Sequence, residues 1–241
     1  MLHVGTIKSI YRYPVKSMAG EQLASAQVGW HGIDGDRRFA FVRAGNMSGF
    51  PWLTASKMPE LIRYRAHHLE SNEDALPTVR VETPDGNDVG VESESLRQLV
   101  ASTYGTEVTL IGVRNGIFDD APISLISTTT IGKLESDSGC VLDPRRFRPN
   151  ILVEPAGPTG LDESLWTGKT LVFGDHPHSP AVRVTARDVR CVMVNLDPET
   201  AVADARVLKS IVRSQDKCAG VYATVFAIGT VSAGDKLYLK D

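Results

Sequence analysis

The sequence predicts a mostly β protein with a few helices, and three observations support this fold class. The first half of the chain breaks into short strand-like runs at even spacing, separated by Gly and Pro turns, which favours a β-barrel or sandwich over βαβ units. Few segments place apolar residues at helical spacing. With 241 residues, of which 42% are hydrophobic and 23% charged, the chain can bury a sizeable core as one large domain or two small interlocked ones.

Strands are expected where apolar residues alternate or cluster between turn residues. In the first half these runs are residues 4–13, the run before Gly29, and residues 39–42, 61–66 and 78–81. In the second half they are residues 147–153, 170–173, 181–187, 220–228 and 236–239. A soft boundary lies in segment 112–122, so we expect one domain at 1–114 and a second at 115–241.

Three segments are expected to be helical. Residues 96–104 carry one apolar face, and Ser93 or Ser95 is a suitable N-cap. Residues 127–134 can form a short helix, although three threonines lower its propensity. The stripe at 207–212 places apolar side chains opposite basic ones, and its simplest interpretation is a helix packed on a sheet.

Charge and hydropathy exclude several classes of partner. A net charge of -3 gives no global attraction to nucleic acid or to an anionic membrane. No stretch approaches the roughly 20 consecutive apolar residues of a membrane span. The first residues show neither a signal-peptide nor a transit-peptide pattern, so we expect a cytoplasmic protein with no membrane or nucleic-acid partner.

The three cysteines, Cys140, Cys191 and Cys218, are too few and too widely spaced to suggest a disulfide framework or the four thiolates of an iron–sulfur cluster. Cys191 differs from the others because it follows Arg187 and Arg190, whose charges favour the thiolate that binds soft metals. It is expected just past a strand end, where side chains meet ligands. The alternative is a small buried hydrophobe, in which case the functional interpretation fails.

Basic residues gather at three further places in the sequence. If Lys16, Arg38 and Arg148 converge, they make a site for a phosphorylated ligand, because arginine forks bind phosphate bidentately and lysine acts as a point charge. The alternative is that each arginine only pairs with a nearby acid, such as Asp36 or Asp143, at the surface.

Four motifs carry a family resemblance. They are Tyr-Pro-Val-Lys-Ser at 13–17, Asp-Arg-Arg-Phe at 36–39, Arg-Phe-Arg-Pro-Asn-Ile at 146–151 and Arg-Cys-x5-Asp-Pro-x-Thr at 190–200. In this order and spacing they resemble MOSC-domain proteins with an N-terminal β-barrel domain, the group that contains the mitochondrial amidoxime-reducing component and its bacterial relatives. The resemblance covers essentially the whole chain and implies a β-barrel MOSC domain combined with an N-terminal β-barrel-like domain. One departure is Ala201, where the family motif ends in glycine.

The resemblance implies that the chain binds the molybdenum cofactor, a pterin whose dithiolene sulfurs and one protein cysteine hold molybdenum. Cys191 would be that metal ligand and a catalytic residue. Asp119 falls where the family has an acid near the pterin, so it is the second implied catalytic residue. The implied cofactor-binding residues are Lys16, Ser17, Arg38, Arg148, Pro149, Asn150, Cys191 and Tyr222. Tyr222 could equally be a strand residue in the core.

By the same resemblance, the expected activity is a reductase that removes oxygen from N-hydroxylated compounds such as amidoximes and hydroxylaminopurines. The chain has too few cysteines for an iron–sulfur cluster and stops at Asp241 after its last expected strand. Electrons are therefore expected from a separate donor protein, a ferredoxin or a reductase. Two rival interpretations are a non-catalytic cofactor or sulfur-carrier module that uses a Cys191 persulfide, and a plain β-barrel interaction domain without cofactor.

Overall fold

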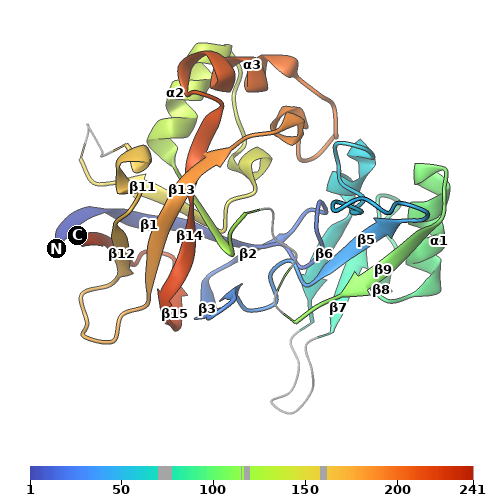
Figure 1. Ribbon diagram of the computed structural model, residues 1–241, viewed down its shortest axis with the longest axis horizontal. Helices are drawn as coiled ribbons and strands as arrows, with labels where there is room; N and C mark the ends of the chain where they lie inside the picture. The colour runs from blue at the N-terminus through green and yellow to red at the C-terminus, as the bar shows by residue number, and fades with distance from the viewer. Residues whose placement is uncertain (70–77, 115, 117–119, 158–161, 241) are drawn as a thin grey trace.

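The structure is a computed structural model that describes residues 1–69, 78–114, 116, 120–157 and 162–240. A β-barrel is covered at one end by helices α2 and α3, and a smaller β-rich lobe beside it carries helix α1 (Figure 1). This architecture confirms the predicted mostly β fold class. No helix in the described part of the chain is long and apolar enough to span a membrane.

Within the described residues, seven strands close into a barrel in the order β11-β10-β14-β13-β12-β16-β1, and the pairing of β1 with β11 completes the ring. Their bounds are β1 Leu2–Arg12, β10 Ile123–Ser127, β11 Ile151–Pro155, β12 Thr170–Phe173, β13 Ala181–Val189, β14 Cys218–Ala227 and β16 Lys236–Lys240. The barrel interior is a continuous apolar cluster that includes Ile7, Trp166 and Phe173. Closure leaves these strands no free edge for unwanted pairing.

Strand β1 lies before the expected domain boundary but belongs to this barrel. It pairs antiparallel with β11, where Ile7 lies opposite Val153, and with β16, where Leu2 lies opposite Leu239. The side chain of Ile7 is buried in the barrel core. The first eleven or so residues therefore hold the two parts of the chain together.

Helix α2 (Thr128–Ser138) connects β10 to its parallel neighbour β11 and forms a βαβ unit. Ser127 accepts a hydrogen bond from the Thr130 backbone N–H and is the N-cap of the helix. Helix α3 (Ala205–Ser214) packs beside α2, and the two share a core cluster that joins the apolar faces of both helices. The predicted helices at 127–134 and 207–212 are thus confirmed.

The smaller lobe has its own core cluster. Helix α1 (Glu94–Tyr104) starts at the N-cap Ser93 and lies against the strands of this lobe. The strands of this lobe form two sheets. One pairs β5 Phe39–Arg43 with β9 Val108–Gly112, and the other contains β6 Arg65–His68, β7 Val79–Glu82 and β8 Asp88–Gly90. Strand β2 (Glu21–Leu23) extends the barrel sheet, and a separate sheet contains β3 Ser25–Gly29, β4 Gly32–Ile33 and β15 Gly229–Ser232.

Two predicted strands start later than expected. Residues 61–63 are not extended, because Pro59 starts the 3-10 helix η1 (Pro59–Arg63) and β6 begins only afterwards. Phe147 lies in the 3-10 helix η2 (Pro144–Phe147) for a similar reason, since Pro144 follows the N-cap Asp143. In both places a proline that fixes φ overrides a run of β-favouring side chains.

Candidate functional site

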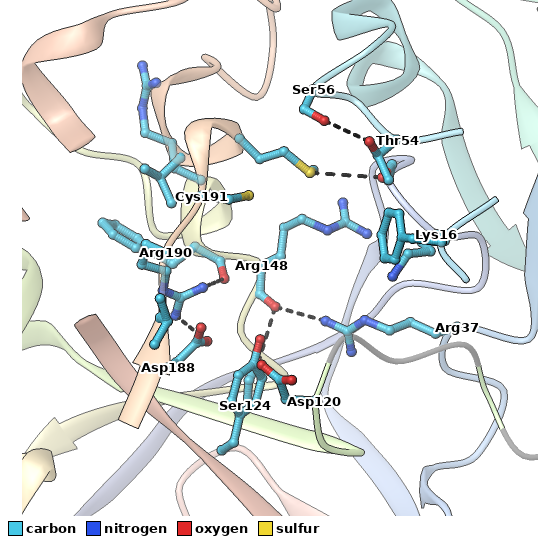
Figure 2. Close-up of a pocket in the computed structure, with 18 residues that line it drawn as sticks. Lys16, Arg37, Thr54, Ser56, Asp120, Ser124, Arg148, Asp188, Arg190 and Cys191 are labelled. Atoms are coloured by element: carbon cyan, nitrogen blue, oxygen red, sulfur yellow. Dashed lines mark hydrogen bonds and ion pairs between the residues drawn. The ribbon is translucent and has the colours of Figure 1, made fainter. Parts of the chain in front are cut away.

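A cavity of about 340 Å³ lies where the smaller lobe meets the barrel (Figure 2). Its volume is in the range of small-molecule sites. From the first half of the chain it is lined by Lys16, Ser17, Arg37, Phe50, Thr54 and Ser56. From the second half it is lined by Asp120, Ser124, Arg146, Phe147, Arg148, Asp188, Val189, Arg190, Cys191, Met193, Val194 and Tyr222.

Cys191 lies two residues after the end of strand β13 and is the N-cap residue of the 3-10 helix η4 (Val192–Asn195). Its side chain is exposed, and Figure 2 shows the sulfur directed into the cavity. Cys140 and Cys218 are not among the described lining residues. Cys191 is therefore not a buried packing residue, and its thiol can meet a ligand in the cavity.

The arginines before Cys191 have partners other than its sulfur. Arg190 is buried, and it donates hydrogen bonds to the carbonyls of Ala219 (2.7 Å) and Phe147 (2.8 Å) and pairs with Asp188 (2.7 Å). These contacts fix the backbone next to Cys191 to the barrel. Arg187 lies outside the described lining and donates to the Gln215 carbonyl.

One wall of the cavity is basic. Figure 2 shows Lys16, Arg37 and the guanidinium of Arg148 across the cavity from Cys191. The ammonium of Lys16 is 5.7 Å from the Phe50 ring centroid. This lysine is only 6% exposed. Guanidinium and ammonium groups with nearby hydroxyls, such as that of Ser17, are the donors that phosphate groups bind.

Three lining residues have a left-handed backbone. The φ angle is 66° at Ser17, 48° at Arg37 and 47° at Arg148, and none of them is glycine. Such a conformation costs a non-glycine residue about 1–3 kcal/mol. Strain of this kind is concentrated at functional sites, so its occurrence three times around one cavity supports a binding role.

Asn150 is fully buried and lies behind the cavity wall rather than in the lining. Its side-chain carbonyl accepts hydrogen bonds from the Ser124 backbone N–H (3.1 Å) and from Arg37 (3.2 Å). Its side-chain amide donates to Asp36 (3.1 Å), which is itself 2.5 Å from the Arg37 guanidinium. Asn150 thus positions Arg37, and Pro149 beside it is likewise buried outside the lining.

The other predicted site residues divide between lining and non-lining positions. Tyr222 in β14 lines the cavity. Arg38 does not appear in the described lining, and its backbone carbonyl accepts a hydrogen bond from Val113. Asp119 lies outside the described residues, whereas the next residue, Asp120, lines the cavity. The sequence indicated Arg38 rather than Arg37, because side-chain type alone does not distinguish two adjacent arginines.

The segment after Cys191 is held by Asp197. One carboxylate oxygen accepts hydrogen bonds from the backbone N–H groups of Glu199 (3.1 Å) and Thr200 (3.0 Å) and from the Thr200 hydroxyl (3.0 Å). Although partial burial opposes it, these hydrogen bonds and the charge of Arg146 lower the pKa of Asp197. The turn continues into Ala201 with φ 60°.

The cavity combines one soft metal ligand with donors for an anion. Among the described residues, no group of three or more His, Cys, Asp or Glu side chains can hold a metal ion. A metal in this cavity would therefore need ligands of its own in addition to the exposed thiol of Cys191, which suits soft metals. The basic wall supplies donors for an anionic group on the same ligand.

Fold and site together define a β-barrel protein with an exposed cysteine at a basic cavity of small-molecule size. The chain belongs to the MOSC domain family: the MOSC domain signature matches residues 110–238, and that of the MOSC N-terminal beta barrel domain matches residues 4–116.

Named relatives are distant. Mitochondrial amidoxime reducing component 2 of Homo sapiens is 23% identical, over 98% of this chain and 83% of its own. The Bos taurus protein of the same name is 25% identical over 50% of this chain, and that match spans only 37% of its length. The crystal structure of the YUAD protein from Bacillus subtilis has a TM-score of 0.54 at 13% identity, covering 98% of this chain and 95% of that one, and shows the shared fold alone.

Proposed function

We propose that this protein is a molybdenum-cofactor-dependent reductase that removes oxygen from N-hydroxylated substrates such as amidoximes and hydroxylaminopurines. The observation that carries the proposal is that the exposed Cys191 thiol and the basic side chains of Lys16, Arg37 and Arg148 line one cavity. Membership of the MOSC domain family and the distant similarity to proteins named for amidoxime reduction support it.

Cys191 would be the protein ligand of the metal. Lys16, Ser17, Arg37 and Arg148 would hold the pterin and its phosphate through charge-assisted hydrogen bonds. When bound, the cofactor supplies the electron-transfer and oxygen-transfer chemistry. The chain's own contribution is a thiolate, an anion clamp and a shaped cavity.

Reduction of an N–OH group consumes two electrons and two protons and releases water. Asp120 is the lining carboxylate that we assign to proton transfer at its Oδ atoms, because it is exposed to solvent. Asp188, the other acid in the described lining, is buried and paired with Arg190. General acids need a protonation route from solvent, which the exposed position of Asp120 provides.

Electrons would come from a separate donor protein, a ferredoxin or a reductase. The three cysteines of this sequence are fewer than the four thiolates that an iron–sulfur cluster usually takes.

A second candidate function, a sulfur-carrier module with a Cys191 persulfide, is favoured by the same exposure of Cys191. Both functions use Cys191, but only the reductase would turn over an N-hydroxylated substrate.

The proposal is tested by expressing the full chain in a molybdenum-competent host and in a host that cannot make the pterin. Stoichiometric molybdenum and pterin in the first preparation only, followed by reduction of benzamidoxime by the chemically reduced protein, supports the reductase. Bound cofactor without turnover of benzamidoxime or a hydroxylaminopurine favours the carrier. Absence of both metal and pterin from the first preparation contradicts the reductase.

A further inference from the structure

Tyr13 lies against two of the arginines that line the Cys191 cavity. The guanidinium carbon of Arg148 is 4.2 Å from the Tyr13 ring centroid, and that of Arg37 is 5.4 Å from it. Both distances are within the range of about 6 Å in which a cation is attracted to the face of an aromatic ring. One ring therefore contacts arginines from two sequence motifs that are more than 100 residues apart.

The backbone of Tyr13 is hydrogen-bonded to the segment that contains Arg37. The Tyr13 backbone N–H donates to the Asp36 carboxylate (2.7 Å), and the Arg37 N–H donates to the Tyr13 carbonyl (2.7 Å). Pro14 restricts the backbone of the residue before it to extended conformations. Only 3% of Tyr13 is exposed, so the ring has a fixed place beneath the basic wall.

The phenol hydroxyl contributes little to this arrangement. It is buried and has no hydrogen-bond partner among the described residues. Burial also raises the pKa of the Tyr13 phenol, so the group is neutral. The contacts with the arginines therefore come from the ring face, which phenylalanine shares.

We infer that Tyr13 is a positioning residue that holds the guanidinium groups of Arg37 and Arg148 toward an anionic group bound in the Cys191 cavity. It acts through the arginines, because it is not among the described lining residues of that cavity. It lines instead a neighbouring cavity of about 120 Å³, and Arg148 lines both. A ring orients the arginines without adding a negative charge that would compete with the ligand.

This inference rests on the proposed function, because it assumes that the basic wall binds the phosphate of a ligand. Arg37 is also held by Asp36 and Asn150, and Arg148 also donates a hydrogen bond to the Met18 carbonyl, but Arg148 makes the closer ring contact. Loss of the ring should therefore release Arg148 more than Arg37. The effect should be a weaker anion site rather than a lost one.

The test measures binding of inorganic pyrophosphate by calorimetry to the full chain from a host without pterin synthesis. We expect Tyr13→Leu to weaken the affinity about tenfold, equivalent to about 1.4 kcal/mol. Tyr13→Phe should bind within about twofold of the wild type, because it keeps the ring face. Tyr64→Leu is the matched control, since Tyr64 is buried in the core of the smaller lobe and outside the cavity lining, so it should lose stability but keep its affinity.

The outcomes separate this inference from the proposed function. If the wild type binds no pyrophosphate and retains no pterin in a competent host, the proposed function fails and the inference fails with it. If the wild type binds and Tyr13→Leu binds equally well, only the positioning role is overturned. Weak binding by Tyr13→Phe would also overturn it, because the hydroxyl would then be the active part. Should Tyr13→Leu not fold, Tyr13→Met in its place removes the ring with a side chain that adapts to the core.

Discussion

Arg146 and Asp197 join two of the motifs that surround the cavity. The Arg146 guanidinium donates to the Asp197 carboxylate at 2.9 Å and to the Asn195 carbonyl at 2.9 Å. Arg146 lies in η2 with the basic motif, and Asp197 begins the turn that follows the Cys191 segment. Because Arg146 is only 9% exposed, this contact fixes the Cys191 segment relative to the basic wall.

The hydrogen bonds that Asp197 accepts from Thr200 and Glu199, together with the charge of Arg146, should make stability depend on pH. The pKa of Asp197 is lowered in the folded state, so its carboxylate contributes stability above the unfolded-state pKa, and that contribution is lost as pH falls through the folded-state pKa. We expect Asp197→Asn to lower the free energy of unfolding at pH 7 and to differ less from the wild type as pH falls below the unfolded-state value of about 3.9. Urea unfolding at several pH values measures this, and an equal difference at pH 7 and pH 2.5 would contradict it.

Ala201 should be a site of stabilisation. Its φ of 60° places a β-carbon in a left-handed conformation that glycine adopts without penalty. We expect Ala201→Gly to raise the free energy of unfolding by about 0.5–1 kcal/mol, part of the gain being offset by lost packing of the methyl group. Ala203→Gly is the control: Ala203 is not among the positive-φ residues, so the change should lower stability. A lower stability of Ala201→Gly in chemical denaturation would show that no strain is relieved there.

The two adjacent arginines of the Asp-Arg-Arg motif should differ in function. Arg37 lines the cavity, and Arg38 is not among its described lining residues. We expect Arg37→Gln to weaken pyrophosphate binding at least tenfold, by loss of a charge-assisted contact of about 1.5–3 kcal/mol, and Arg38→Gln to change it by less than twofold. Calorimetry on the two variants is sufficient. The reverse ranking would place the anion contact at Arg38.

The sequence correctly predicts elements that are marked by local patterns, such as N-cap residues and the alternation of a strand. Ser93 and Ser127 cap α1 and α2 as their side-chain chemistry favours. The alternation in residues 181–187 becomes strand β13, and Cys191 lies just past the end of that strand. The confirmed features depend on neighbours in sequence, for which spacing and side-chain type are sufficient.

Features that depend on residues far apart in the sequence cannot be predicted from local patterns. Strand β1 completes a barrel whose other strands all follow residue 120, and no local pattern indicates that pairing. Arg37 is selected over Arg38 by a left-handed backbone and by a hydrogen bond to Asn150, 113 residues away. The burial of Asn150 behind the wall likewise follows from its four side-chain partners and not from its place in the motif.

The most direct test of the metal-ligand assignment is the molybdenum and pterin content of Cys191→Ala purified from a molybdenum-competent host. Cys140→Ala is the matched control, because Cys140 is half-buried and contacts Asp204 away from the cavity. We expect the Cys140 variant to keep wild-type molybdenum and the Cys191 variant to lose it, with folding stability changed by no more than about 0.5 kcal/mol since Cys191 is exposed. Wild-type molybdenum content in Cys191→Ala would contradict the assignment.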